Sequence, residues 1–216
     1  MKDYSTIFFD LDGTLTRSGD GIMNGVAYAL RSIGIEEDRR EVLQSFIGPP
    51  LIRRFMEVYG VDQDTAKELQ AIYRKYYTET GVYENALYEG VPEMLSRFRD
   101  AGRTLVIATS KPHMYVDIVV DRFGIREYFD FIASADLDAG RSTKTQVLDY
   151  AFGSLQITDR SAVILVGDRM YDAIGAREAG IDCMGVLYGY GSREELEREG
   201  VICIAETVPE IASILL

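Results

Sequence analysis

Hydrophobic and polar positions follow two different periods along the chain. Short apolar runs rich in β-branched and aromatic residues predict buried strands at 5–9, 104–108, 131–133, 162–166 and 183–187. Apolar residues between the later strands recur at helical spacing, and several of these segments end at a glycine. The alternation of strands and helices predicts a parallel sheet that is covered by helices on both faces.

Residues 16–85 interrupt this alternation. Apolar residues recur there at helical spacing in three segments, of which the first ends at Gly34 and the second starts after the Gly48-Pro49-Pro50 break, and no strand pattern is present. The simplest architecture is a doubly wound α/β core made of residues 1–15 plus 86–216, with an inserted all-helical cap at 16–85.

Composition and charge exclude several classes of protein. The chain has 23 Lys plus Arg against 35 Asp plus Glu, a net charge of −12, which argues against nucleic acids and anionic membranes as partners. No apolar run reaches the ~18 residues of a membrane span, and the apolar stretch near the N-terminus is too short for a signal peptide. Cys183 and Cys203 are too few for a disulfide framework. We expect a cytoplasmic protein, either a monomer or a homodimer.

Polar side chains follow three of the predicted strands, where doubly wound sheets bind their ligands. They are Asp10, Asp12 and Gly13 after the first strand, Thr109, Ser110 and Lys111 after the second, and Asp168 and Asp172 after the fourth. Lys144 begins the helix that follows the third strand. Gly189-Tyr190-Gly191, after the last strand, lacks the third glycine of a dinucleotide-binding loop and predicts only a turn.

This set of side chains suits phosphoryl transfer. Carboxylates are the oxygen ligands that Mg²⁺ prefers, and a carboxylate can also attack phosphorus to form an aspartyl phosphate. A second carboxylate, two positions beyond the first, can protonate the leaving oxygen and then activate water. Hydroxyls and a lysine can meet the charge on the phosphoryl oxygens.

The four motifs resemble, in order and spacing, those of the haloacid dehalogenase superfamily. They are Asp10-Leu-Asp12-Gly13-Thr14, Thr109-Ser110, Lys144 and Gly167-Asp168-x-x-x-Asp172. The resemblance implies Asp10 as nucleophile, Asp12 as general acid and base, Thr109 as phosphate ligand and Lys144 as charge clamp. It also implies Mg²⁺ held by Asp10, the Asp12 carbonyl and Asp168, with Asp172 acting through water.

The segments 46–51 and 167–169 look most like the phosphoglycolate phosphatase branch, which also holds nucleotidases and pyrophosphatases. We therefore expect a Mg²⁺-dependent phosphatase of small phosphomonoesters, similar to phosphoglycolate phosphatase, with a 5′-nucleotidase or pyrophosphatase as the alternative. Two departures from the family pattern matter. Thr145 stands where a proline often follows the lysine, which leaves Lys111 as a rival clamp, and Arg169 stands where small polar residues are common; we expect it in a salt bridge.

Substrate contacts are predicted for Ser110, Gly13, Gly48 and Arg53, and the pattern leaves open whether Arg53, Arg54 or Arg169 reaches the substrate.

Three other functions fit less well. A calcium loop starting at Asp10 would need Gly and Glu where Leu15 and Gly21 stand. A β-phosphoglucomutase-like mutase would carry histidine at Ile22. A phospho-acceptor signalling domain would be shorter and lack the cap.

Overall fold

The computed structural model describes residues 2–137 and 140–216, and the described chain divides into two compact units. One unit contains the residues up to Arg17 together with Leu87–Leu216, and the other is Ser18–Ala86. Within the first unit, the chain that leaves and the chain that returns run side by side. Thr16 forms a bridge with Leu87, and the Tyr88 N–H donates to the Leu15 carbonyl at 3.1 Å.

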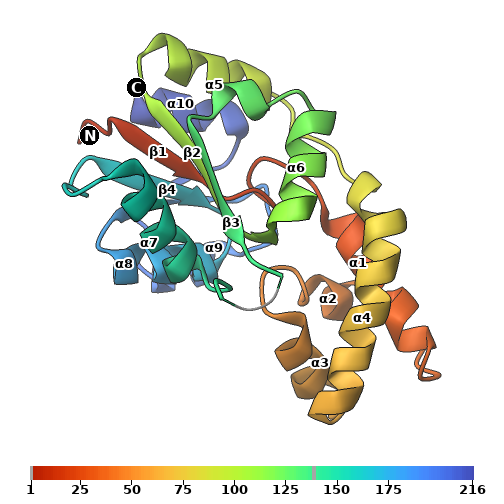
Figure 1. Cartoon of the computed structure of the whole chain (residues 1–216). Helices are drawn as coiled ribbons and strands as arrows, with labels where there is room; N and C mark the ends of the chain where they lie inside the picture. Colours follow the sequence, from red (N-terminus) through yellow and green to blue (C-terminus); the bar gives the residue numbers. More distant parts are fainter. Residues whose placement is uncertain (1, 138–139) are drawn as a thin grey trace. The chain divides into compact units, whose positions relative to one another are not determined.

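A parallel sheet of six strands organises the first unit (Figure 1). The strands are β1 (Thr6–Phe9), β2 (Thr104–Pro112), β3 (Phe131–Ala135), β4 (Val163–Gly167), β5 (Asp182–Val186) and β6 (Cys203–Ala205). Their order is β3-β2-β1-β4-β5-β6, and Phe9 pairs with Ile107 of β2 and with Val166 of β4. The predicted doubly wound α/β fold with a helical insertion between the first two strands is confirmed.

The helices of this unit cover both faces of the sheet. They are α5 (Val91–Asp100), α6 (His113–Arg122), α7 (Lys144–Leu155), α8 (Met170–Ala179), α9 (Arg193–Arg198) and α10 (Val208–Leu215), with a short 3₁₀ turn, η2, at Arg126–Tyr128. Figure 1 shows α5 and α10 on one side of the sheet and α7 and α8 on the other.

Alternate residues of each central strand face opposite helical layers, so the strands are apolar throughout. Phe8 belongs to a buried cluster with Val106, Leu165 and residues of α7 and α8, and its ring stacks on Phe152 with centroids 5.4 Å apart. The neighbouring Phe9 faces the other layer, where its ring lies 6.1 Å from Phe98 of α5.

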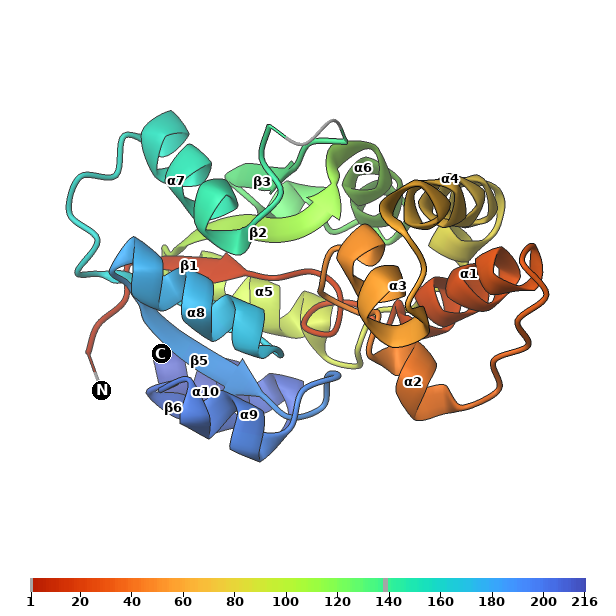
Figure 2. The ribbon, with the colours of Figure 1, turned by 90° about the horizontal axis from the view of Figure 1, so that it is seen from below.

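The second unit is helical, as the pattern predicts. It contains α1 (Gly19–Arg31), α2 (Arg40–Gln44), α3 (Leu51–Tyr59), α4 (Gln63–Glu79) and the 3₁₀ turn η1 (Gly81–Tyr83). Figure 2 shows α1 and α3 beside α4, and Tyr73 and Tyr77 of α4 are buried and stacked on each other. These two tyrosine rings therefore contribute to the packing of this unit.

Two elements were not predicted from the sequence. The β6 strand has three residues, of which only Ala205 is fully buried, so its apolar pattern is too short to indicate a strand. The α2 helix has five residues and buries only Leu43. The predicted end of the second strand at Ala108 is also wrong. The β2 strand continues to Pro112 with a register shift after Thr109, because its last residues pair with β3.

None of the helices within 2–137 and 140–216 is both long and apolar enough to cross a membrane.

We predict that Phe8→Ala lowers the free energy of unfolding by about 3–5 kcal/mol, because the ring is fully buried between the sheet and α7 and its loss leaves a cavity. Met114→Ala serves as the control, since this α6 side chain is 40% exposed, and it should change the same quantity by less than about 0.5 kcal/mol. Urea unfolding followed by circular dichroism measures both. Equal effects would contradict the assigned core.

Candidate active site

Three aspartates meet at the carboxyl edge of the central strands. Asp10 follows β1, Asp168 follows β4, and Asp172 lies in the first turn of α8. One carboxylate oxygen of each lies within 4.8 Å of the others, and all three residues are buried. Because β1 and β4 are neighbours in the sheet, this geometry follows from the strand order.

Lys144 supplies the cation of this cluster. Its ammonium donates to Asp10 Oδ1 at 2.6 Å and to the Ala108 carbonyl at 2.8 Å, and it lies 2.8 Å from Asp172 Oδ1. Local structure fixes its position, since a capping box between Thr143 and Gln146 begins α7 directly before it. Gly175 of α8 leaves room for its stem, because a Cβ there would lie 2.6 Å from Lys144 Cγ.

Burial and mutual repulsion oppose the charges of the acids. Burial raises the pKa of Asp10 to about 6, with Asp172 adding to the rise and Lys144 opposing it. Burial also raises the pKa of Asp168, and the charges of Asp172 and Asp10 act in the same direction. For Lys144, burial alone would lower the pKa, but the two neighbouring carboxylates outweigh it and raise the pKa.

Asp172 is engaged through both of its oxygens. Oδ2 accepts from the Arg169 N–H at 3.0 Å, which caps the start of α8. Oδ1 has no hydrogen-bond partner among the described residues but forms an ion pair with Lys144 at 2.8 Å. Asp168 differs, because its Oδ2 accepts from the Tyr190 N–H at 2.7 Å while its buried Oδ1 has neither a hydrogen-bond partner nor an ion-pair partner among the described residues.

Asp12 pairs with the other lysine. The Lys111 ammonium donates to both Asp12 oxygens, at 2.9 and 3.0 Å, and its side chain is only 4% exposed. Lys111 belongs to the irregular end of β2, where its backbone N–H donates to Thr109 Oγ1 at 3.2 Å. The two lysines that the sequence left as rivals thus contact different carboxylates, Lys144 with Asp10 and Lys111 with Asp12.

The remaining predicted residues fall in both units. Thr109 is buried and Ser110 half-buried on β2, and Gly13 has a φ of 88° that brings its backbone against Asp168.

Gly48 and Arg53 belong to the helical unit. Arg53 donates to Glu57 Oε1 at 2.6 Å and is 77% exposed, and the part of Gly48 and Arg53 in substrate binding stays a prediction. Arg169 forms the expected salt bridge, with its Nε 2.9 Å from Glu195 Oε1.

The segment after β5 also lies at this site, although its sequence predicted only a turn. Besides the contact of Tyr190 with Asp168, the Tyr188 hydroxyl donates to the Thr14 carbonyl at 2.8 Å. The signal was present in the sequence, because these residues follow a strand of the same parallel sheet and so come to the same edge.

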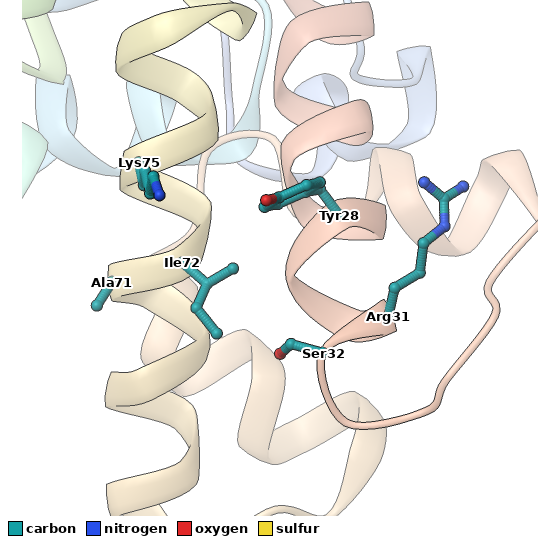
Figure 3. A pocket seen from close by; sticks show the side chains of 6 residues that line it. All are labelled: Tyr28, Arg31, Ser32, Ala71, Ile72 and Lys75. Carbon is teal, nitrogen blue, oxygen red and sulfur yellow. The ribbon is translucent and has the colours of Figure 1, made fainter.

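The helical unit has a shallow pocket of its own between α1 and α4 (Figure 3). Its lining residues are Tyr28, Arg31, Ser32, Ala71, Ile72 and Lys75. It contains none of the predicted site residues and no carboxylate, so its composition offers no catalytic group of the kind that the aspartate cluster provides.

We predict that Lys144→Met destabilises the protein by about 3–5 kcal/mol at pH 8 without divalent cations, because it leaves three buried carboxylates without a counter-charge. The loss should be smaller at pH 5. An acid whose folded pKa is raised favours folding at low pH, and for Asp10 this contribution disappears as the pH rises from 3.8 to about 6. Urea unfolding at both pH values measures the effect.

Lys67→Met is the matched control, since Lys67 forms an exposed pair with Asp64 and should matter little at either pH. A Lys144→Met loss that is the same at pH 5 and pH 8 would show that the carboxylates are not the cause.

Comparison with known proteins gives consistent results. Residues 7–186 match the family model of haloacid dehalogenase-like hydrolases. The crystal structure of a predicted phosphatase from Clostridium acetobutylicum is similar to this chain with a TM-score of 0.94 and 40% identity, over 99% of each chain.

Curated relatives carry different names. A 5′-nucleotidase of Pseudomonas aeruginosa is 39% identical over 89% of this chain and 87% of its own length. Tyrosine-protein kinase PtkA of Mycobacterium tuberculosis is 34% identical over 97% of this chain and 72% of its own length. A phosphoglycolate phosphatase of Vibrio parahaemolyticus is 25% identical over 100% of this chain and 97% of its own length. The family match and these similarities agree with the four motifs, and the chain belongs to the haloacid dehalogenase-like hydrolases, in the phosphoglycolate phosphatase-like branch with a helical cap.

Proposed function

We propose that this enzyme is a Mg²⁺-dependent phosphatase that hydrolyses small phosphomonoesters through an aspartyl phosphate on Asp10. The observation that carries the proposal is the buried cluster of Asp10, Asp168 and Asp172 around one lysine at the carboxyl edge of the sheet. Buried carboxylates in this number are costly unless a cation compensates them, so the cluster is built for a function.

The residues present fit a divalent cation. Three carboxylates and one ammonium sum to −3 + 1 = −2, and the partnerless Asp168 Oδ1 is a free oxygen donor among the described residues. Asp10 and Asp168 would hold the ion directly, whereas Asp172, engaged at both oxygens, would act through water. When bound, Mg²⁺ would offset the negative charge of the phosphate and of the cluster.

Asp10 is the nucleophile of the proposed reaction. A carboxylate oxygen of Asp10 forms a bond to phosphorus while the bond from phosphorus to the ester oxygen breaks. Lys144, already on Asp10 Oδ1, and the buried Thr109 hydroxyl on the neighbouring strand would stabilise the charge that spreads over the phosphoryl oxygens.

Asp12 is the general acid and general base of the proposed reaction. It gives a proton to the departing ester oxygen in the first step. In the second step it accepts a proton from the water that attacks phosphorus, which releases inorganic phosphate and restores Asp10. The Lys111 ammonium on both Asp12 oxygens holds this carboxyl group in one orientation.

The comparisons bear on the substrate class. The relative named 5′-nucleotidase is 39% identical to this chain and the phosphoglycolate phosphatase 25% identical. This supports a nucleoside 5′-monophosphate as substrate ahead of phosphoglycolate, the reverse of the order that the motifs suggested.

We predict that Asp10→Asn lowers kcat for p-nitrophenyl phosphate by about 10³-fold or more, because the amide cannot act as the nucleophile. Asp100→Asn, an equivalent change at an exposed position of α5, should leave kcat unchanged. Steady-state release of nitrophenolate measures both. Substantial turnover by Asp10→Asn would exclude Asp10 as the attacking group.

We predict that a panel of nucleoside 5′-monophosphates, phosphoglycolate, sugar phosphates and pyrophosphate gives the highest kcat/KM for a nucleotide, and only with Mg²⁺ present. Inorganic phosphate release is the readout, and EDTA provides the metal-free control. A higher kcat/KM for phosphoglycolate or pyrophosphate would reject the nucleotide assignment. Phosphoryl transfer to a tyrosine acceptor without release of phosphate would reject the hydrolase.

A further inference from the structure

The chain directly after β5, Tyr188–Gly191, contacts the aspartate cluster through its backbone. The Tyr190 N–H donates to Asp168 Oδ2 at 2.7 Å, a partly buried hydrogen bond that is charge-assisted when this fully buried carboxyl group is ionised. A carboxylate held at one oxygen cannot rotate freely about its Cβ–Cγ bond. The bond therefore fixes where the other oxygen, Oδ1, lies.

Two glycines make this approach possible. A Cβ on Gly189 would lie 2.3 Å from Asp168 Cβ and 2.5 Å from Asp168 Oδ2, and a Cβ on Gly191 would lie 2.0 Å from the Asp168 carbonyl oxygen. All three separations are shorter than non-bonded atoms allow. Neither glycine has a positive φ, so close contact with Asp168, rather than an unusual backbone conformation, requires glycine at both positions.

The tyrosine between β5 and these glycines anchors the segment. The Tyr188 hydroxyl donates to the Thr14 carbonyl, and the Tyr188 ring meets the Tyr88 ring edge to face with centroids 4.7 Å apart. Thr14 lies in the Asp10–Thr14 motif, so the segment is tied both to the acid after β4 and to the motif after β1.

We propose that Tyr188–Gly191 is a positioning segment for the metal site. The Tyr190 N–H holds Asp168 Oδ2, and Oδ1 is thereby presented to the divalent cation. This inference rests on the metal site of the proposed function. Groups that orient a metal ligand through its second oxygen raise metal affinity, and their loss typically weakens binding by about 10–100-fold.

The test measures Mg²⁺ binding directly, by isothermal titration calorimetry on the full chain without substrate. Gly189→Ala displaces Asp168, and Tyr190→Pro removes the N–H donor. Each should weaken Mg²⁺ affinity by about tenfold or more. Tyr190→Ala keeps the N–H and should lose less affinity than Tyr190→Pro. Gly153→Ala, at an open position of α7 with no atom within 4 Å of the added Cβ, should bind like the wild type.

A second measurement uses only the wild-type protein and does not depend on whether the variants fold. If the hydrogen bond and the ion support each other, saturating Mg²⁺ must slow hydrogen exchange of the Tyr190 amide, because the coupling is reciprocal. The Gly153 amide reports any general change in stability.

The outcomes separate this inference from the proposed function. Wild-type protein that binds no Mg²⁺ contradicts the metal site itself. Wild-type protein that binds Mg²⁺, with Gly189→Ala and Tyr190→Pro binding equally well, overturns the positioning segment and leaves the metal site standing. A Tyr190 amide whose exchange is unchanged by Mg²⁺, in a protein that binds the ion, overturns it as well.

Discussion

The burial of three carboxylates against one lysine is the constraint on which the unit that contains the sheet depends. In a medium of low dielectric, the formal charge of −2 on this cluster is unfavourable unless the carboxylate oxygens contact a cation or accept hydrogen bonds. Lys144 compensates Asp10 and Asp172, and backbone N–H groups hold Asp172 and Asp168. Such donors compensate charge without adding bulk, so the backbone must come very close to the acids. Several glycines allow it, since a Cβ would overlap Asp168 or Asp172 at Gly13, Gly167, Gly189 and Gly191.

The strand order decides where this cluster can form. In the order β3-β2-β1-β4-β5-β6, the chain connections run outwards in opposite directions from β1 and β4, and the loops after these two strands diverge at that point. Ligand sites of doubly wound sheets lie at such a reversal. Asp10 and Asp168 come from its two sides, Thr109 and Lys111 come from β2, and the Tyr188–Gly191 segment comes from β5. Four neighbouring parallel strands thus contribute to one site, which no local segment of the sequence could build alone.

The two lysines illustrate how charge is divided within the site. Lys144 is part of the buried cluster, and its pKa is raised by Asp10 and Asp172 against the effect of burial. Lys111 reaches Asp12 from the irregular end of β2, where the register shift turns the chain after Thr109. The overall charge of −12 therefore says little about the field that a phosphate ester meets. In the proposed function, attraction of the anionic substrate would depend on these two ammonium groups and on a divalent cation held by the aspartates.

The sequence alone determined the class of fold and the principal acids of the site. Runs of apolar residues in the central strands reflect burial on both faces of the sheet, and side chains that follow parallel strands must meet at one edge, so Asp10, Asp168 and Asp172 were predictable. Tertiary structure decided the rest. The β6 strand and the α2 helix are too short for a periodic signal, and the pairing of Lys111 with Asp12 depends on a register shift that composition does not encode. The position of Gly189 and Gly191 after a strand of the same parallel sheet places them at the edge of the site, but their close approach to Asp168 has no local signature in the sequence. Only the tertiary structure decides this contact, because the Tyr190 N–H donates to a carboxylate that lies 22 residues earlier in the chain.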